Sequence, residues 1–316
     1  MKTRILKPDS HGIAAAAALL AQGALVAIPT ETVYGLAGDA RNPRAVAAIY
    51  EAKGRPAFNP LIVHLPDLAA AERIAVFDAP ALALARAFWP GALTLVLPLR
   101  PGAGIAGLVT AGLSTVAIRV PALAVARDLL RAFGGPLAAP SANPSGRISP
   151  TAAAHVADPE TGLGGRIAAV LDAGPCPVGV ESTILGWVDG APALLRPGGV
   201  AAEAIEAVLG RPLARPVLDA AAPSAPGQLT SHYAPRAPVR LDAREARPGE
   251  LLIGFGPIAG EMSLSEAGDP TEAAARLFEL LHRADADGRP IAVAPVPETG
   301  LGAAVNDRLR RAAAPR

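Results

Sequence analysis

Short apolar runs alternate with amphipathic stretches over the first 210 residues of the chain. An apolar run bounded by Gly, Pro or polar residues predicts a buried strand, and apolar residues recurring every three to four positions behind a capping residue predict a helix. We expect helices at residues 10–21, 43–52, 67–74, 80–88, 122–133 and 201–209. We expect strands at residues 24–28, 61–65, 92–99, 114–121, 137–139, 167–172, 181–187 and 193–196.

The expected strands outnumber the helices that could cross between them. Because parallel neighbours need a crossover connection, usually a helix, this excess favours a sheet with both parallel and antiparallel pairs. The pattern therefore predicts an α/β fold built on a mixed sheet.

The pattern changes at residues 211–238, which are dense in Pro, Ala and Ser and have no apolar period. Such a composition predicts a linker. Beyond it, short apolar runs and two helical stretches, at about 270–285 and 301–313, predict a small α/β unit. We therefore expect a larger domain at 1–210, a linker at 211–238 and an accessory domain at 239–316.

The composition narrows the function classes. A chain of 316 residues favours two domains, and 51% hydrophobic residues can fill their cores. Only 3% of the residues are aromatic and the net charge is +1, which argues against a base-stacking or polyanion-wrapping surface. The single cysteine, Cys176, excludes an internal disulfide and a cysteine-based zinc site. No stretch resembles a signal peptide or a membrane span, so we expect a cytoplasmic protein.

The segment "PTETVYGLAGDA" follows the apolar run at 24–28 and places Thr30, Glu31, Thr32 and Tyr34 at the end of a strand. Polar groups at this place usually cap the next helix. The next predicted helix, however, begins only at about Pro43. A second interpretation is that these groups contact a ligand.

The segment "KGRPAFNPLIVH" gathers Lys53, Arg55, Asn59 and His64 around two prolines. Lys53 is the only lysine beyond residue 7. Two cations in a stiff loop suit phosphate or bicarbonate, because both anions accept several charge-assisted hydrogen bonds. A solvated turn with a histidine at the edge of the core remains an alternative.

The strand "STVAIRVP" places Thr115, Ala117 and Arg119 on one face. An arginine on a half-buried strand needs an anionic partner. That partner is either a carboxylate of the protein or a carboxylate of a ligand.

The loop "APSANPSGRISP" offers Ser141, Asn143, Ser145 and Ser149 between prolines. Its hydroxyls could bind ribose, phosphate or magnesium, or could form self-capping turns. The strand ends in "VESTIL" and "LLRPGG" add Glu181, Ser182, Thr183 and Arg196.

The segment "GAGIAG", residues 102–107, matches the dinucleotide fingerprint GxGxxG. Pro101 precedes it, and a loop and a strand are expected after it in place of a helix. The context required for dinucleotide binding is therefore missing, and a flexible loop is the better interpretation.

Together the motifs resemble those of the YrdC-like family of L-threonylcarbamoyladenylate synthases. "PTETVYGLAGDA", "KGRPAFNPLIVH", "WPGALTLVL", "STVAIRVP", "APSANPSG", "VESTI" and "LRPGG" occur in the order typical of that family. "SHYAPRAP" and the terminal "GLGAAVNDRLRRAA" resemble its longer, two-domain branch. The resemblance covers nearly the whole chain.

The resemblance implies a YrdC-like mixed twisted sheet with a large concave cavity and a small Rossmann-like C-terminal domain. It implies a nucleotidyltransferase that makes L-threonylcarbamoyladenylate from L-threonine, bicarbonate and ATP and releases pyrophosphate. The product serves N6-threonylcarbamoyladenosine formation at position 37 of tRNAs reading ANN codons, through a downstream tRNA threonylcarbamoyl transferase complex. Mg²⁺ would be bound by the ATP phosphates, and no protein residue is assigned to it. Stable tRNA binding is not expected.

The resemblance also implies roles for individual residues. Lys53 and Arg55 would be catalytic. L-threonine would be held by Thr32, His64, Arg119, Ala139 and Ser182. ATP or the adenylate would be held by Arg55, Asn59, Thr115, Ser141, Ser149, Arg196 and Tyr233. Residues 225–236 of the linker would act as a lid over the cavity.

Two rival functions are considered. A structured-RNA-binding module without adenylation activity could use a wide cavity, but the near-neutral charge and few aromatics count against it. Carbamoyl transfer in hydrogenase maturation uses a similar domain, but normally together with zinc-finger and acylphosphatase-like segments that this sequence lacks.

Overall fold

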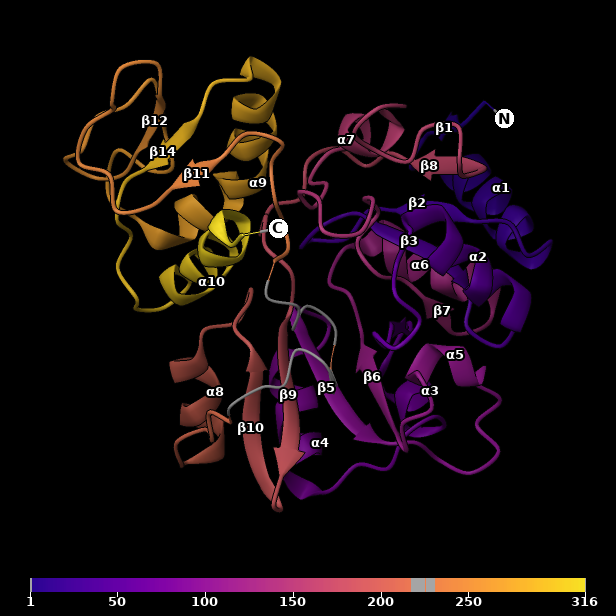
Figure 1. Cartoon of the computed structure of the whole chain (residues 1–316). Coiled ribbons are helices and arrows are strands. Elements are labelled where there is room, and N and C mark those ends of the chain that lie inside the picture. Colours follow the sequence, from indigo (N-terminus) through magenta and orange to yellow (C-terminus); the bar gives the residue numbers. More distant parts are fainter. Residues whose placement is uncertain (1, 217–224, 226–230, 316) are drawn as a thin grey trace.

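A computed structural model of the protein describes residues 2–216, 225 and 231–315. Within these residues the chain forms a ten-stranded mixed sheet and a separate four-stranded sheet whose pairs are all parallel (Figure 1). The expected α/β fold with a mixed main sheet is confirmed. None of the described helices is both long and apolar enough to cross a membrane.

The strand order of the main sheet is β1-β8-β2-β3-β7-β4-β6-β5-β9-β10. Parallel pairs are β1 with β8, β8 with β2, β4 with β6 and β5 with β9, and the other neighbours are antiparallel. The strands are β1 (Arg4–Leu6), β2 (Val26–Ile28), β3 (Gly35–Asp39), β4 (Ile62–His64), β5 (Leu93–Pro98), β6 (Thr115–Arg119), β7 (Leu137–Ala138), β8 (Ala169–Leu171), β9 (Thr183–Val188) and β10 (Ala191–Arg196).

The helices that cover this sheet begin where the capping chemistry places them. Asp9, Asn42, Asp67 and Asp78 each accept a backbone N–H in the first turn of the helix that follows. The first of these caps, Asp9, lies just before Ser10, where the helix begins. The helices are α1 (Ser10–Ala21), α2 (Pro43–Lys53), α3 (Leu68–Glu72), α4 (Ala79–Phe88), α5 (Gly107–Thr110), α6 (Ala124–Phe133), α7 (Ala153–Ala157) and α8 (Ala202–Leu209).

Several short elements were not expected from the sequence. β1, β3, α5 and α7 are among them, and each has five residues or fewer. β3 lies in "GLAGD", where a glycine-rich run hides a strand. Gly38 nevertheless needs to be small there, because a Cβ would lie 3.1 Å from side-chain atoms of both Ile49 and Leu25. α5 begins at Gly107, the last residue of the "GAGIAG" segment, whose Gly102 and Gly104 have φ of 73° and 72°, and a strand, β6, comes next.

The smaller sheet has the order β11-β14-β12-β13 and packs with two helices. Its strands are β11 (Val239–Arg240), β12 (Leu251–Gly254), β13 (Met262–Ser263) and β14 (Ile291–Val293), and its helices are α9 (Pro270–Asp287) and α10 (Gly302–Ala313). β13 was not expected.

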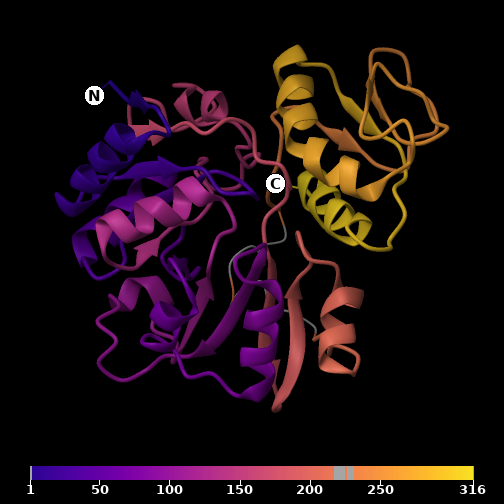
Figure 2. The ribbon, with the colours of Figure 1, turned by 180° about the vertical axis from the view of Figure 1, so that it is seen from behind.

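The two sheets share apolar packing. The core around α9 and α10 includes Val33, Ile148 and Val180 of the larger unit and Tyr233 of the linker. Figure 2 shows the same arrangement from behind, with α4 in front of the long strands and the smaller unit above them at the upper right. The smaller unit is therefore docked on the larger one through buried side chains.

Candidate functional site

The carboxyl ends of the two central parallel strands define the site. In the register of β4 and β6, His64 lies opposite Arg119, and both side chains are buried. The loops after β2 and β7 and the segment just before β9 reach the same edge and bring Thr32, Ser141 and Ser182 beside them. Strand ends of this kind are where open α/β sheets usually bind ligands.

A cavity of about 50 Å³ lies at this edge. The described residues that line it are Thr30, Thr32, Val33, Gly35, Arg55, Ile62, His64, Arg119, Ala139, Pro140, Ser141, Glu181, Ser182, Arg196, His232 and Tyr233. Nine of the predicted site residues are among them: Thr32, Arg55, His64, Arg119, Ala139, Ser141, Ser182, Arg196 and Tyr233. The remaining predicted residues, Lys53, Asn59, Thr115 and Ser149, lie elsewhere.

The polar cluster after β2 divides between turn formation and the cavity. The Thr30 hydroxyl donates to the Val33 carbonyl at 2.6 Å and lies 2.9 Å from the Thr32 hydroxyl, so Thr30 closes a tight turn. Tyr34 points away and donates to the Gly174 carbonyl at 2.7 Å. Of the four polar residues, Thr30 and Thr32 line the cavity.

Glu31 does not cap a helix, and its carboxylate binds β6 and the segment before α6. Its Oε2 accepts from the backbone N–H of Ala122 at 2.8 Å, just before α6. Its Oε1 accepts from Arg119 Nη2 at 2.5 Å. Burial on its own raises the pKa of Glu31, but Arg119 and these hydrogen bonds hold it below the ordinary value. The carboxylate therefore stays ionised.

Arg119 thus has a protein carboxylate as partner, the first of the two alternatives drawn from the sequence. It also donates to the Thr32 hydroxyl at 2.8 Å and to the Gly91 carbonyl at 3.2 Å. These contacts use three of its five N–H groups. Two donors are left on a guanidinium that lines the cavity.

His64 is held neutral beside Arg119. Burial, and secondarily the charge of Arg119, lower the pKa of His64 to about 3. Its Nδ1 lies 3.3 Å from the Ile62 carbonyl. When Nδ1 donates to that carbonyl, Nε2 is left as a hydrogen-bond acceptor.

Arg55 and Arg196 are buried without a carboxylate partner in the described part of the chain. Arg55 donates to the carbonyls of Asn59 and Pro60, and Arg196 donates to the carbonyl and hydroxyl of Ser182. Burial lowers the pKa of Arg55 to about 10 and lowers that of Arg196 as well. Burying an unpaired charge costs free energy. Binding of an anion beside Arg55 and Arg196 would offset that cost.

Lys53 holds the loop that carries Ser141. It ends α2, and its Nζ donates to the carbonyls of Ser141 and Asn143, each at 2.5 Å. Burial and the nearby charge of Arg55 lower the pKa of Lys53 well below its ordinary value. The side chain does not line the cavity, so the geometry assigns it to holding the serine loop, and its predicted contact with bicarbonate or phosphate stays a prediction.

Three further predicted ATP ligands also lie off the cavity wall. The Ser149 hydroxyl donates to Glu181 Oε1. The Asn59 amide is fully buried, and neither its nitrogen nor its oxygen has a partner among the described residues. Thr115 begins β6 and lines a separate hollow with Val96, Trp187 and Leu195. Their predicted contacts with ATP stay predictions.

His232 and Tyr233, which belong to the expected linker, line the cavity. His232 and Tyr233 are 6% and 1% exposed, and their rings meet edge to face with centroids 4.1 Å apart. Tyr233 has a φ of 61°, a conformation that is strained for a bulky residue. The rest of the expected lid, residues 226–230, lies outside the described residues.

The sequence named Glu181 without giving it a role, and it did not indicate Arg308. Glu181 lines the cavity, and Arg308 of α10 donates to Glu181 Oε2 at 2.8 Å while being fully buried. His232 was also not assigned to the site. The terminal "VNDRLRR" segment carried a signal for Arg308, since it belongs to a motif shared with the resembling branch, but its distance along the chain hid the contact.

Comparison with known proteins agrees with this geometry. Residues 18–198 match the Sua5/YciO/YrdC family model, described as telomere recombination, and residues 200–314 match the C-terminal domain of threonylcarbamoyl-AMP synthase. The threonylcarbamoyl-AMP synthase of Bacillus subtilis strain 168 is 44% identical, over 98% of this chain and 94% of its own length.

Solved structures give the same result. The crystal structure of Pyrococcus abyssi Sua5 complexed with L-threonine superposes with a TM-score of 0.88 and 38% identity, covering 99% of this chain and 98% of that one. A P. abyssi Sua5 variant with an adjacent His and Tyr replaced by Ala gives a TM-score of 0.88 and 36% identity, covering 98% and 96%. The chain therefore belongs to the threonylcarbamoyl-AMP synthase family, in the branch that carries both the Sua5/YciO/YrdC domain and the C-terminal domain.

Proposed function

We propose that this protein synthesises L-threonylcarbamoyladenylate from L-threonine, bicarbonate and ATP, with release of pyrophosphate. The product would supply N6-threonylcarbamoyladenosine formation at position 37 of tRNAs reading ANN codons, through a separate tRNA threonylcarbamoyl transferase complex in the cytoplasm. The observation that carries the proposal is the set of buried cations, Arg55 and Arg196, that face one cavity with Arg119 and lack enough carboxylates to balance them.

The wall formed by β4 and β6 suits an amino acid. The two remaining donors of Arg119 fit a carboxylate, because a guanidinium binds that group in a planar, often bidentate contact. The Thr32 and Ser182 hydroxyls and the neutral His64 lie around it. A β-hydroxyl on the substrate would find both donors and acceptors there, which favours threonine over a purely apolar amino acid.

Another part of the cavity lining suits a polyphosphate. Arg55 and Arg196 supply the charge, and the Ser141 hydroxyl lines the same cavity. The buried Asn59 amide, which has no partner among the described residues, would gain one on a small movement of the 55–60 loop. These groups would neutralise charge on the leaving pyrophosphate.

The reaction needs positioning rather than a protein nucleophile. The threonine amine adds to bicarbonate to give a carbamate and water, and the carbamate oxygen attacks the α-phosphorus as the bond to pyrophosphate breaks. Holding two anions together is costly in water, and a preorganised cationic cavity offsets that cost. The neutral His64 can accept a hydrogen bond from the amine through Nε2, which helps to orient it.

Mg²⁺ would accompany ATP. Glu181 is the one carboxylate among the described residues lining the cavity, and both of its oxygens are engaged, by Ser149 and Arg308. Mg²⁺ commonly keeps several waters and binds substrate phosphates with one or two carboxylates. The residues therefore fit an ion held chiefly by the ATP phosphates, where it would offset their charge.

Entry of the substrates requires the linker to move. Pockets that enclose a ligand of drug size measure roughly 300–1,000 Å³, whereas this cavity measures about 50 Å³ with His232 and Tyr233 in place. Residues 225–236 would act as a lid that opens for ATP and closes during adenylation.

A labelling experiment tests the proposal directly. The purified full-length chain is incubated with Mg-ATP, L-threonine and ¹⁴C-bicarbonate, and the products are separated by chromatography. The proposal expects label in a compound with the mass of threonylcarbamoyl-AMP, only when threonine is present. Label that remains in bicarbonate under all conditions would refute it.

A further inference from the structure

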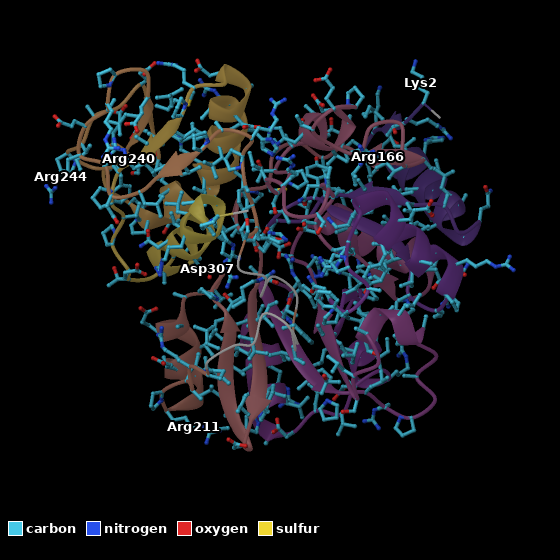
Figure 3. The ribbon with its side chains drawn as sticks, viewed as in Figure 1. Lys2, Arg166, Arg211, Arg240, Arg244 and Asp307 are labelled. Atoms are coloured by element: carbon cyan, nitrogen blue, oxygen red, sulfur yellow. The ribbon has the colours of Figure 1, made fainter. Side chains whose placement is uncertain are left out.

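Arg308 is the most deeply buried charged side chain that the smaller unit directs toward the site. It comes from α10, is 0% exposed, and lies 127 positions along the chain from its partner Glu181. Its neighbour Asp307, labelled in Figure 3, lies on the same helix between the two sheets. A fully buried arginine is rare unless paired, so its contacts reveal what it holds.

Two of these contacts are to residues that line the cavity. Arg308 Nε donates to Glu181 Oε2 at 2.8 Å, and the guanidinium carbon lies 5.3 Å from the centre of the Tyr233 ring. That distance is within the range of a cation–π contact, which strengthens when both groups are desolvated. The Arg308 side chain therefore contacts both Glu181 and Tyr233 of the cavity lining.

The guanidinium is itself held in a fixed orientation. Nη1 donates to the Pro197 carbonyl at 2.7 Å and to Asp307 at 2.8 Å, and Asp307 also accepts from Arg311 Nε at 3.0 Å. Nη2 is buried and has no partner among the described residues. The orientation is thus set by groups on both units, the turn after β10 and the helix α10.

The residues on either side of Tyr233 are both held by backbone hydrogen bonds. The His232 N–H donates to the Arg311 carbonyl at 3.2 Å, and the Ala234 N–H donates to the Gly146 carbonyl at 2.8 Å. Tyr233 between them has a φ of 61°, which a tyrosine does not adopt without support from its surroundings. The cation over its ring and Phe278, whose ring centre is 5.5 Å away, supply that support.

We propose that Arg308 is a positioning residue of the synthase, through which the smaller unit holds the Tyr233 segment closed over the cavity and orients Glu181. The inference rests on the proposed function for its kinetic consequence, but not for the closure itself. The proposal gives the C-terminal unit a defined role, because α10 carries the residue that holds the Tyr233 segment in place.

The test uses Arg308→Lys in the full-length chain, because lysine keeps a charge beside Glu181 but loses the planar guanidinium over the tyrosine ring. Hydrogen exchange is followed at the amides of His232 and Ala234. We expect exchange there to become at least about fivefold faster, because loss of the cation–π contact makes local opening of this segment easier. The Ile253 amide in β12 should not change. Arg310→Lys, an exposed position on the same helix, is the matched control and should leave all three amides unchanged.

Kinetics in two backgrounds separates positioning from general damage. With Tyr233 present, Arg308→Lys should lower kcat/KM for ATP by at least about fivefold. In a Tyr233→Ala background the same substitution should change it by less than twofold, because the ring that the guanidinium contacts is already gone and lysine keeps a charge beside Glu181. Equal losses in both backgrounds would show that Arg308 acts on the structure in general and would overturn the proposal.

Tyr233→Leu provides the readout if Arg308→Lys does not fold, since it leaves both buried charges in place. It should speed exchange at His232 and Ala234 by a similar factor, and unchanged exchange there would overturn the proposal. The exchange arm does not depend on catalysis. A wild-type chain without synthase activity would therefore refute the proposed function while the exchange result still decides the role of Arg308.

Discussion

At the scale of single residues, the properties of the site depend on which buried charges have partners. Arg119 pairs with Glu31 and Arg308 pairs with Glu181, whereas Arg55 meets only carbonyl groups. A charge that is buried and unpaired destabilises the empty protein and is relieved by an anionic ligand. Arg55 is therefore expected to contribute more to ATP binding than to folding.

Arg55→Gln should weaken ATP binding by at least about tenfold, because a charge-assisted hydrogen bond is worth about 1.5–3 kcal/mol. Threonine affinity should stay within a factor of three, since Arg55 is not part of the β4 and β6 wall. Calorimetric titration with each ligand measures both. Arg131→Gln, at an exposed ion pair with Asp128, is the control. ATP affinity within twofold of the wild type would contradict the assignment.

Arg119 tests whether a ligand carboxylate is needed in addition to Glu31. Arg119→Gln should weaken threonine binding by at least about tenfold and should also lower stability, because it leaves Glu31 buried without its cation. The double variant Glu31→Gln with Arg119→Gln removes that unpaired charge. If the double variant binds threonine like the wild type in calorimetry, Arg119 does not bind the threonine carboxylate, and Glu31 is its carboxylate partner.

His64 gives a pH dependence with a defined sign. Its pKa is about 3 in the folded protein against an ordinary value of 6.5, so the unfolded chain binds more protons between these values. Stability should therefore rise with pH across this window and be lost on acidification from pH 6.5. The slope for one proton is about 1.4 kcal/mol per pH unit. Urea unfolding of the wild type and of His64→Gln at pH 7 and pH 5 measures the difference.

The His64→Gln protein should lose about 2 kcal/mol less than the wild type between pH 7 and pH 5. His11→Gln, on the exposed face of α1, serves as the control and should behave like the wild type. Equal acid sensitivity of the wild type and His64→Gln would show that His64 is not the group responsible.

The sequence could indicate the site residues but not their pairing. Residue types and motif order pointed to nine of the side chains that line the cavity. The Glu31–Arg119 and Glu181–Arg308 pairs join residues 88 and 127 positions apart, and no local pattern records such a contact. Lys53 and Ser149 were predicted as ligand contacts from their residue types, but they bind other protein groups. A residue type suited to phosphate can equally serve to fix a loop.

At the scale of elements, the turn after β10 sets the position of the cavity wall. A Cβ added to Gly198 would lie 2.3 Å from the Ser182 carbonyl carbon and 2.4 Å from the Glu181 oxygen. Such contacts are to backbone, which cannot move aside cheaply. The turn therefore packs directly against the segment that presents Glu181 and Ser182.

Gly198→Ala should displace that segment and reduce both stability and ligand binding. We expect a loss of about 1–3 kcal/mol in the free energy of unfolding, as for other overpacked sites. Gly107→Ala is the matched control, because a Cβ there meets nothing within 4 Å. Equal unfolding free energies for the two variants in denaturant titration would contradict the close packing.

Elements were predictable where pattern and length agreed. α1, α2, α4 and α6 have at least ten residues each and were found to within about two residues at their ends. β3 was missed because its five residues, "GLAGD", lack the β-branched and aromatic side chains that mark a strand. Its pairing with β2 and β7 is a tertiary effect that overrides local preference.

At the scale of the whole molecule, the two sheets act as one unit at the site. Val33, Ile148 and Val180 pack into the core around α9, and α10 sends Arg308 to Glu181. The second family match begins at residue 200, ahead of the expected linker. The domain boundaries at 210 and 238 stay predictions, because buried contacts on both sides connect the units they would separate.

Above all, we propose that the cavity joins threonine, bicarbonate and ATP in a single adenylation. Pyrophosphate release measures this reaction directly. The full-length chain is incubated with Mg-ATP, and threonine and bicarbonate are added separately and together. We predict release only when both are present, with a loss on omission of either. Release that is independent of threonine, or no release together with salt-sensitive binding of structured RNA, would show that the cavity does not perform this reaction.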